Sequence, residues 1–332
     1  MTPSAPSVVI TGASAGVGRA TALRFARDGA RICAIARSQR GLDDVQQELE
    51  AAGAEVITLA LDVSDWKALL SGADEVARRW DGIDVWINSA MATMFAPVSD
   101  MTCEEYARIT HVTYLGYVYG TMAALRHMRP SNRGAIVQVG SALAYRAIPL
   151  QSAYCGAKFA IRAFSDALRS ELIHDNSAVR ITMVQLPAVN TPQFDWARNR
   201  MPGRPRPVPP VFDPADMAEI IHRAVRKGPR ELWVGSPTLK LIAGTIAAPN
   251  WLDRYLSRAG YSGQFVPGGI GQRREGNLFE PAMDGHATRG SFSNETKPRP
   301  TAFRPSFVRA YVAVAIASIL AFAAGCVVLW MS

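Results

Sequence analysis

The chain has 332 residues, of which 48% are apolar, and a formal net charge of +8; this length and composition allow a full hydrophobic core in one large or two small domains. Its four cysteines show no CxxC or other ligand spacing, so we expect packed, reduced thiols and neither a disulfide framework nor a metal site. The basic excess lies near the end of the chain without interleaved aromatic residues, which favours a membrane surface and argues against nucleic acid as a partner.

Short β-branched runs alternate with longer helical stretches from residue 7 to about residue 234. The runs lie at residues 8–10, 32–35, 56–59, 85–87, 136–139, 181–184 and 231–234. Such alternation is typical of right-handed βαβ crossovers, which build a parallel sheet with helices on both faces. The pattern predicts one Rossmann-like α/β domain at residues 1–260, with a doubly wound parallel sheet of seven strands; the strand order 3-2-1-4-5-6-7 is what the family resemblance described below implies.

Beyond residue 260 the composition changes to Gly, Pro, Ser, Asn and scattered charges, with no apolar period that could bury a face. We therefore predict a flexible, mostly unstructured linker at residues 261–306. The linker would connect the domain to an apolar segment at the end of the chain.

Residues 307–332 are predicted to form a membrane anchor, because residues 311–331 carry no charge. At ~1.5 Å per residue a helix of this length reaches roughly 30 Å, the thickness of the hydrocarbon core of a bilayer. The alternative is a buried core helix, but core helices are usually shorter and have a polar face. Aromatic residues suited to the membrane interface, Tyr311 and Trp330, lie at its ends, and cations precede it. We expect a single-pass membrane protein with its main domain in the cytoplasm, since no basic, apolar leader precedes the first strand.

The segment TGASAGVG at residues 11–18 directly follows the first apolar strand and precedes a helix. Glycines at such a turn let the backbone approach a pyrophosphate, whose charge faces the N–H groups of the helix. The predicted cofactor contacts here are Gly12, Ser14, Gly16, Val17 and Gly18. Gly-rich turns also occur for packing reasons alone, but the strand before, the helix after and the downstream residues described below favour a dinucleotide site.

Cofactor choice is expected to depend on Arg37, which ends the second strand where the adenosine ribose would lie. A guanidinium can hold the 2′-phosphate of NADP bidentately, whereas an Asp at this position would favour NAD. The alternative is a solvated arginine at a strand end. Asp62 is placed to bond the adenine amine, with Val63 packing on the ring; the alternative role of helix N-cap belongs more naturally to Ser64.

A phenol and an amine lie one helical turn apart at Tyr154 and Lys158, and Ser141 follows the apolar run at residues 136–139. These are the groups that carbonyl reduction by a nicotinamide needs. A free phenol has a pKa of about 10, so cycling near neutrality requires a shift of about 3 units, or roughly 4 kcal/mol. Lys158 and the positive ring of the oxidised cofactor can supply much of this shift. The alternative of an ordinary surface pair is disfavoured by Ser141, and the neighbouring Cys155 has no nearby base to make it a nucleophile.

The chain resembles the short-chain dehydrogenase/reductase family from residue 7 to about residue 235. The resemblance rests on TGxxxGxG at residues 11–18, Ser141, YxxxK at residues 154–158 and Pro-x-x-x-Thr at residues 187–191. It implies that Tyr154 donates a proton to the carbonyl oxygen, which Ser141 orients. It also implies that Lys158 binds the nicotinamide ribose and lowers the pKa of the phenol, and that Thr191 contacts the carboxamide end.

Two positions depart from the family pattern. The fourth strand usually ends in Asn-Asn-Ala-Gly, whereas this chain has Asn-Ser-Ala-Met; Asn88 stays a predicted cofactor contact, and Met91 either shifts the loop or forms pocket wall. The helix asparagine of the family's catalytic tetrad aligns with Thr113, which we place in the relay between Lys158 and solvent. His111 lies on another face of that helix and is not expected to replace it.

Together these residues predict an oxidoreductase that transfers a hydride between NADP(H) and a carbonyl or alcohol, with NAD as the less favoured cofactor. The segment at residues 191–212 lies where such enzymes keep a substrate lid, and its aromatic Phe194 and Trp196 favour an apolar small-molecule substrate. The alternative is a non-catalytic NADP-binding scaffold or sensor at a membrane, which Thr113 and Met91 leave open. A homo-oligomer is also left open.

Overall fold

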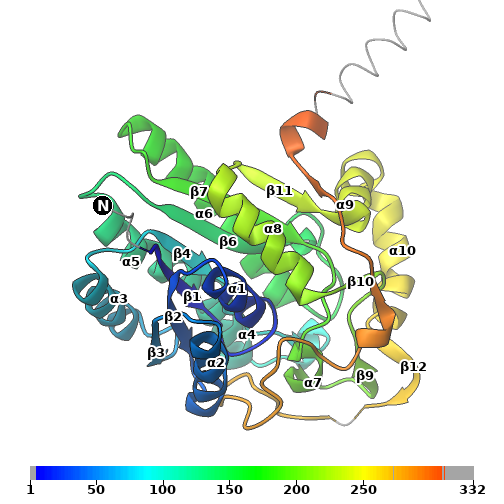
Figure 1. The fold of residues 1–332 in the computed structure, drawn as a ribbon. Helices are drawn as coiled ribbons and strands as arrows, with labels where there is room; N and C mark the ends of the chain where they lie inside the picture. Colours follow the sequence, from blue (N-terminus) through cyan, green and yellow to red (C-terminus); the bar gives the residue numbers. More distant parts are fainter. Residues whose placement is uncertain (1–4, 272, 309, 311–332) are drawn as a thin grey trace, which may run out of the picture.

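The computed structural model describes residues 5–271, 273–308 and 310. Its centre is a twisted sheet with helices on both faces (Figure 1). The sheet has eight strands in the order β14-β11-β7-β6-β4-β1-β2-β3. They are β1 (Ser7–Thr11), β2 (Arg31–Ala36), β3 (Val56–Ala60), β4 (Val85–Asn88), β6 (Ala135–Ser141), β7 (Arg180–Leu186), β11 (Glu231–Val234) and β14 (Ala302–Phe303).

Seven of these strands are parallel and follow the predicted order, so the expected doubly wound sheet is confirmed. The prediction of seven strands in all was wrong, because β14 pairs with the edge strand β11 in the antiparallel direction. Strand β14 comes from a region that lacks the apolar pattern of a strand. Its two residues form a strand only because they pair with β11. The local sequence gives no sign of this pairing.

The parallel strands are buried on both faces, which explains their continuous apolar sequences. In β1, Val8 and Ile10 point into one core and Val9 into the other. Helices α1 (Gly16–Ala26), α2 (Gln39–Ala51) and α8 (Pro214–Lys227) cover the first face. The opposite face packs on α3 (Trp66–Trp80), α4 (Cys103–Thr110), α5 (Gly116–Met128) and α6 (Ser152–His174).

Polar residues define where several helices begin. Ser38 accepts a hydrogen bond from Gly41 N at 3.1 Å at the start of α2. Helix α3 is capped by Asp65, not by Ser64 as expected; its carboxylate accepts from the backbone N–H groups of residues 67 and 68. Such caps satisfy N–H groups that have no partner within the helix.

Smaller elements surround the carboxyl edge of the sheet. They are β5 (Met94–Phe95), η1 (Val98–Asp100), η2 (His111–Leu115), η3 (Ala142–Ala144), α7 (Gln193–Trp196), β8 (Arg198–Asn199), β9 (Gly203–Pro205), β10 (Val211–Phe212), α9 (Gly235–Ala247), α10 (Pro249–Ser262), β12 (Phe265–Ile270), η4 (Ser293–Glu295) and β13 (Thr296–Lys297). Pairing of β9 with β12 and of β10 with β13 ties the C-terminal region to the segment that follows β7.

The region predicted as a flexible linker, residues 261–306, is packed against the domain. The side chains of Leu278 and Phe292 are buried, and Asn277 N donates to Trp196 O at 3.0 Å. In Figure 1 this orange region runs past α2 and α7 before it rises toward β11. The prediction was wrong because the region docks through backbone hydrogen bonds, isolated apolar residues and ion pairs such as Arg289–Asp213, which leave no periodic sequence signal.

The predicted membrane-spanning segment, residues 311–331, lies outside the described residues, as does most of the predicted anchor at residues 307–332. Within residues 5–271 and 273–308, no helix has the length and apolarity needed to cross a bilayer.

Candidate active site

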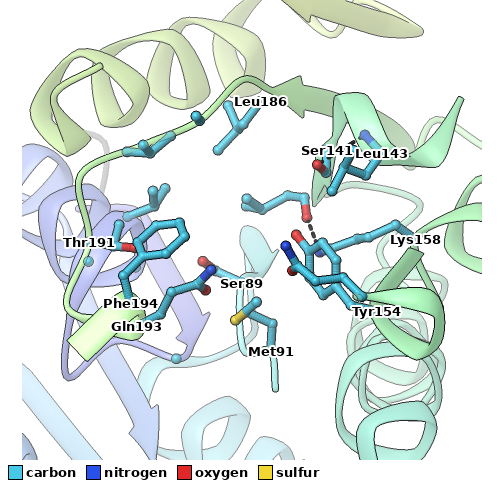
Figure 2. Close-up of a pocket in the computed structure, with 18 of the residues that line it drawn as sticks. Ser89, Met91, Ser141, Leu143, Tyr154, Lys158, Leu186, Thr191, Gln193 and Phe194 are labelled. Atoms are coloured by element: carbon cyan, nitrogen blue, oxygen red, sulfur yellow. Dashed lines mark hydrogen bonds between the residues drawn. The ribbon is translucent and has the colours of Figure 1, made fainter. Parts of the chain in front are cut away.

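A cavity of about 650 Å³ lies at the carboxyl edge of the sheet. In doubly wound folds this edge is where ligands bind, because the loops after neighbouring strands diverge there. Figure 2 shows Ser141, Tyr154 and Lys158 on one side of the cavity, and Thr191, Gln193 and Phe194 on the other. The cavity therefore brings together groups from β6, α6 and the segment after β7.

The glycine-rich turn after β1 forms the floor of the cavity near α1. Gly12 has φ +71° and Gly16 has φ +57°, values that favour glycine. A Cβ on Gly12 would lie 2.8 Å from Ala90 Cα, and one on Gly18 would overlap the carbonyl oxygen of Gly12. Ser14 and Val17 also line the cavity. The turn thus presents bare backbone and the N-terminus of α1, and these residues fit a dinucleotide pyrophosphate.

Lys158 is buried in the wall of the cavity and points toward the end of β6. Its Nζ donates to Val139 O at 2.8 Å and to Tyr117 Oη at 3.1 Å, and lies 4.6 Å from the centre of the Tyr117 ring. Burial lowers the pKa of Lys158 to about 7. A pKa in this range lets the amine exchange protons near neutral pH.

Tyr117 is a site residue that the sequence interpretation missed. Its hydroxyl donates to Val139 O at 2.9 Å and accepts from Lys158, and burial raises its pKa well above the usual phenol value. It lies four residues after Thr113, but the π-helical turn at His111–Leu115 separates the directions of the two side chains. The sequence showed no such turn, so the alignment with the family pattern pointed to Thr113.

Thr113, predicted as a relay residue, contacts a different part of the molecule. Its hydroxyl donates to Ala92 O and accepts from Ala92 N, both at 2.9 Å, and it is fully buried. The structure therefore contradicts the predicted relay contact with Lys158. The π-helix η2 around Thr113 turns this side chain toward the loop after β4, while Tyr117 takes the place beside Lys158.

Tyr154 faces the cavity one turn before Lys158 on α6, with the Lys158 amine 5.5 Å from its ring centre. Burial raises the pKa of Tyr154, and a hydrogen bond with Ser141 acts in the opposite direction. The expected lowering of the phenol pKa by Lys158 is not among the effects on Tyr154 in the described site. The physical reason is that the Lys158 ammonium is directed to Val139 O and Tyr117 Oη.

Ser141 lies at the end of β6, where Gln185 holds its backbone: Ser141 N donates to Gln185 Oε1 at 2.8 Å. The Ser141 hydroxyl accepts from Leu143 N at 3.1 Å and caps η3. Backbone and side chain are thus both fixed, which directs the hydroxyl at the cavity beside Tyr154.

Asn88, predicted as a cofactor contact, lies outside the cavity lining. Its amide donates to Gln138 Oε1 at 2.9 Å and to Thr121 Oγ1 at 3.1 Å, and its carbonyl oxygen accepts from Trp86 Nε1 at 2.8 Å. The prediction was wrong because the pleat of β4 turns this side chain toward α5. The cavity is lined instead by the next residues of the chain, which include Met91 as pocket wall.

The adenosine end of the cavity is lined by Arg37, Asp62 and Val63. Asp62 pairs with Arg108 and accepts from Ser64 Oγ at 2.7 Å, and these bonds help to keep its pKa low against the effect of burial. The carboxylate expected to bond adenine is therefore already committed to protein partners. Arg37 donates to backbone carbonyls of the C-terminal region, which was not foreseen.

The outer part of the cavity is mostly apolar. Its lining includes Phe194, Trp196, Val208, Leu241, Leu252 and Leu256, together with the polar side chains of Gln193, Arg206, Thr238 and Lys240. Thr191 separates this part from the glycine-rich turn, since a Cβ on Gly16 would lie 3.0 Å from Thr191 Cγ2. The cavity therefore has a polar half suited to a nucleotide and an apolar half open to a second ligand.

Comparison with known proteins agrees with this arrangement. Residues 6–201 match the short chain dehydrogenase family, and the chain belongs to it. The chain is 29% identical over 283 residues to the uncharacterised oxidoreductase YxnA of Bacillus subtilis (strain 168), covering 84% of this chain and 79% of YxnA. It is 31% identical over 258 residues to the uncharacterised oxidoreductase Rv1543 of Mycobacterium tuberculosis (strain ATCC 25618 / H37Rv), covering 76% of this chain and 73% of Rv1543.

Among solved structures, levodione reductase superposes with a TM-score of 0.54 and 28% identity, covering 56% of this chain and 73% of that chain. Members of this family use a nicotinamide cofactor. The protein is therefore an NAD(P)-dependent dehydrogenase or reductase acting on a small molecule.

Proposed function

We propose that the protein is an NADP-preferring oxidoreductase that interconverts an apolar carbonyl compound and its alcohol at a membrane surface. The observation that carries this proposal is the single cavity in which Ser141, Tyr154 and Lys158 face an apolar half next to a glycine-rich turn. A bound nicotinamide would supply or accept the hydride. The remaining steps fall to side chains of this chain.

Tyr154 is placed to give a proton to the carbonyl oxygen, or to take one from the alcohol. Ser141 orients that oxygen, because its hydroxyl is fixed at the end of β6. The amine of Lys158, with a pKa lowered to about 7, can exchange protons near neutrality. The phenol must lose its raised pKa during turnover, and a cationic nicotinamide beside it would favour the phenolate.

Arg37 supports NADP as the preferred cofactor. It lies half-buried at the end of β2, lines the cavity and carries a positive charge where the adenosine ribose would bind. The mostly apolar outer half of the cavity supports a hydrophobic substrate, since burial of its aliphatic and aromatic side chains against an apolar ligand is favourable.

Membrane attachment rests on the uncharged sequence of residues 311–331. Large apolar side chains on α9 and α10 support the same proposal, because Ile246 is 79% exposed and Trp251 is 62% exposed. Trp251 stacks on Tyr255, with ring centres 5.3 Å apart. Tyr255 lines the outer cavity, so a bilayer at this surface could deliver an apolar substrate.

The test is NADPH oxidation by the full-length protein with a panel of hydrophobic aldehydes and ketones. Tyr154→Phe keeps the ring and removes the proton donor, so turnover should fall at least about a hundredfold while NADPH still binds. NADPH binding without turnover of any carbonyl in the panel would favour a non-catalytic sensor. Full activity of Tyr154→Phe would place the acid elsewhere.

A further inference from the structure

Residues 277–287, which we call the strap, form a wall of the nucleotide half of the cavity. The strap residues that line it are Asn277, Pro281, Ala282 and His286. One end is fixed by Asn277 N, which donates to Trp196 O at 3.0 Å. The other end is fixed by Ala287 O, which accepts from Gly16 N at 2.9 Å in the glycine-rich turn. The strap thus extends from α7 to the start of α1.

Leu278 anchors this wall next to its Asn277 end. Its side chain is fully buried in the core that contains Met94 and Ile109, and its carbonyl oxygen accepts from Arg108 Nε at 3.1 Å. Arg108 also pairs with Asp62 at the adenosine end of the cavity. Packing of Leu278 therefore determines where the neighbouring strap carbonyls lie.

Those carbonyls hold the guanidinium of Arg37. Arg37 Nη2 donates to Asn277 O at 2.6 Å, and Nη1 donates to Phe279 O at 2.8 Å and to Leu278 O at 3.4 Å. An arginine has five N–H donors in one plane. Three of these donors point at carbonyl oxygens of the strap. Among the described residues, Nε and the second hydrogen of Nη2 make no hydrogen bond.

The strap holds this cation mainly through uncharged groups. Carbonyl groups carry no formal charge, and none of the ion pairs among the described residues includes Arg37. Burial lowers the pKa of Arg37, while the carboxylates of Asp62 and of Glu280 in the strap act in the opposite direction. The remaining donors, on Nε and Nη2, form one edge of the guanidinium, which is the geometry that binds a phosphate bidentately. The 2′-phosphate of NADP would bring a negative charge into direct contact with the guanidinium, whereas the 2′-hydroxyl of NAD would not.

We propose that the strap is a cofactor-selecting element, which favours NADP over NAD by holding Arg37 in the orientation that binds the 2′-phosphate. This inference rests on the NADP preference proposed above. Because coupling between two bound groups is reciprocal, NADP in turn stabilises the docked strap more than NAD does. A C-terminal segment that is distant in sequence from β2 thus determines how well Arg37 distinguishes NADP from NAD.

Hydrogen exchange of the full-length protein tests the coupling without any substitution. Amides of residues 277–287 should exchange more slowly with saturating NADPH than with saturating NADH. Unchanged exchange, or faster exchange with NADPH, would mean that the strap is indifferent to the phosphate or competes with it for Arg37, and either result overturns the proposal.

A double-mutant cycle tests whether the strap acts through Arg37. Dissociation constants for NADPH and NADH are measured by titration for Leu278→Ala, Arg37→Gln and the double variant. Leu278→Ala should reduce the preference for NADPH about tenfold, or ~1.4 kcal/mol. In the Arg37→Gln background it should leave the remaining preference unchanged. Met283→Ala, at an exposed strap residue, is the matched control and should alter neither constant.

The outcomes separate the two proposals. A wild-type protein that binds NADH as tightly as NADPH would contradict the proposed cofactor preference itself. A clear preference for NADPH that is lost in Arg37→Gln but retained in Leu278→Ala would leave that preference standing and overturn the role of the strap.

Discussion

At the residue scale, burial of Lys158 has the clearest consequence for both catalysis and stability. It is buried, donates to a backbone carbonyl and a phenol, and has its pKa lowered to about 7. The same burial that makes it available for proton exchange near neutrality also costs stability whenever the amine is protonated in the folded state.

This cost predicts how stability depends on pH. Between the folded pKa of about 7 and the usual lysine pKa of about 10.4, the unfolded chain binds one more proton at residue 158 than the folded chain. Stability of the wild type relative to Lys158→Met should therefore rise with pH from 7 to 9, with a limiting slope of roughly 1.4 kcal/mol per unit. Urea unfolding of both proteins at several pH values measures the difference. A difference that is constant across this range would show that the amine is not buried in its neutral form.

Tyr117 should act as a positioning residue for Lys158. Tyr117→Phe keeps the ring but removes the acceptor of the ammonium, so the pKa assigned to Lys158 in the pH profile of kcat/KM should fall by roughly one unit. If Tyr117 had only a structural role, Tyr117→Phe would lower the free energy of unfolding and leave the pH profile of kcat/KM unchanged.

Thr113→Val provides the comparison for Tyr117→Phe. The substitution leaves the N–H and C=O of Ala92 without their partner, so it should cost about 1–3 kcal/mol of stability. The pH profile should keep its shape, because Thr113 has no contact with Lys158 in the described site. A shifted profile would restore Thr113 to the proton relay.

At the element scale, the turn between β1 and α1 works only with bare backbone. Gly18→Ala would place a Cβ against the carbonyl oxygen of Gly12, so it should destabilise the fold by ~1–3 kcal/mol and weaken NADPH binding. Gly29→Ala is the control: Gly29 has φ +78° but no atom within 4 Å of an added Cβ. It should cost about 1–2 kcal/mol of backbone strain and leave the NADPH dissociation constant unchanged. Equal losses of NADPH affinity in both variants would argue against a direct role of the turn in binding.

At the scale of the whole molecule, the proposed membrane attachment rests on the uncharged segment at residues 311–331. Truncation after Phe307 removes the uncharged segment and keeps the described core, including β14. The full-length chain should remain in the membrane fraction at both low and high salt, because the proposed span is held by burial of apolar surface in lipid. The truncated chain should move to the soluble fraction and keep its activity. Recovery of the full-length chain in the soluble fraction would contradict the anchor.

Sequence alone determined the parts of this protein whose signals are local. Runs of β-branched residues predicted the seven parallel strands, because strands buried on both faces need continuous apolar sequence. The spacing of Tyr154 and Lys158 predicted that both face one side of α6, because residues four apart lie one turn apart.

Only the tertiary structure decided the features that depend on which distant segments meet. The pleat of β4 directed Asn88 away from the cavity, and the π-helix placed Tyr117, not Thr113, beside Lys158. The docked C-terminal region was invisible in the sequence because its carbonyls, and not its side chains, bind Arg37. Backbone carbonyls are common to every residue, so no sequence pattern can show where they will be used.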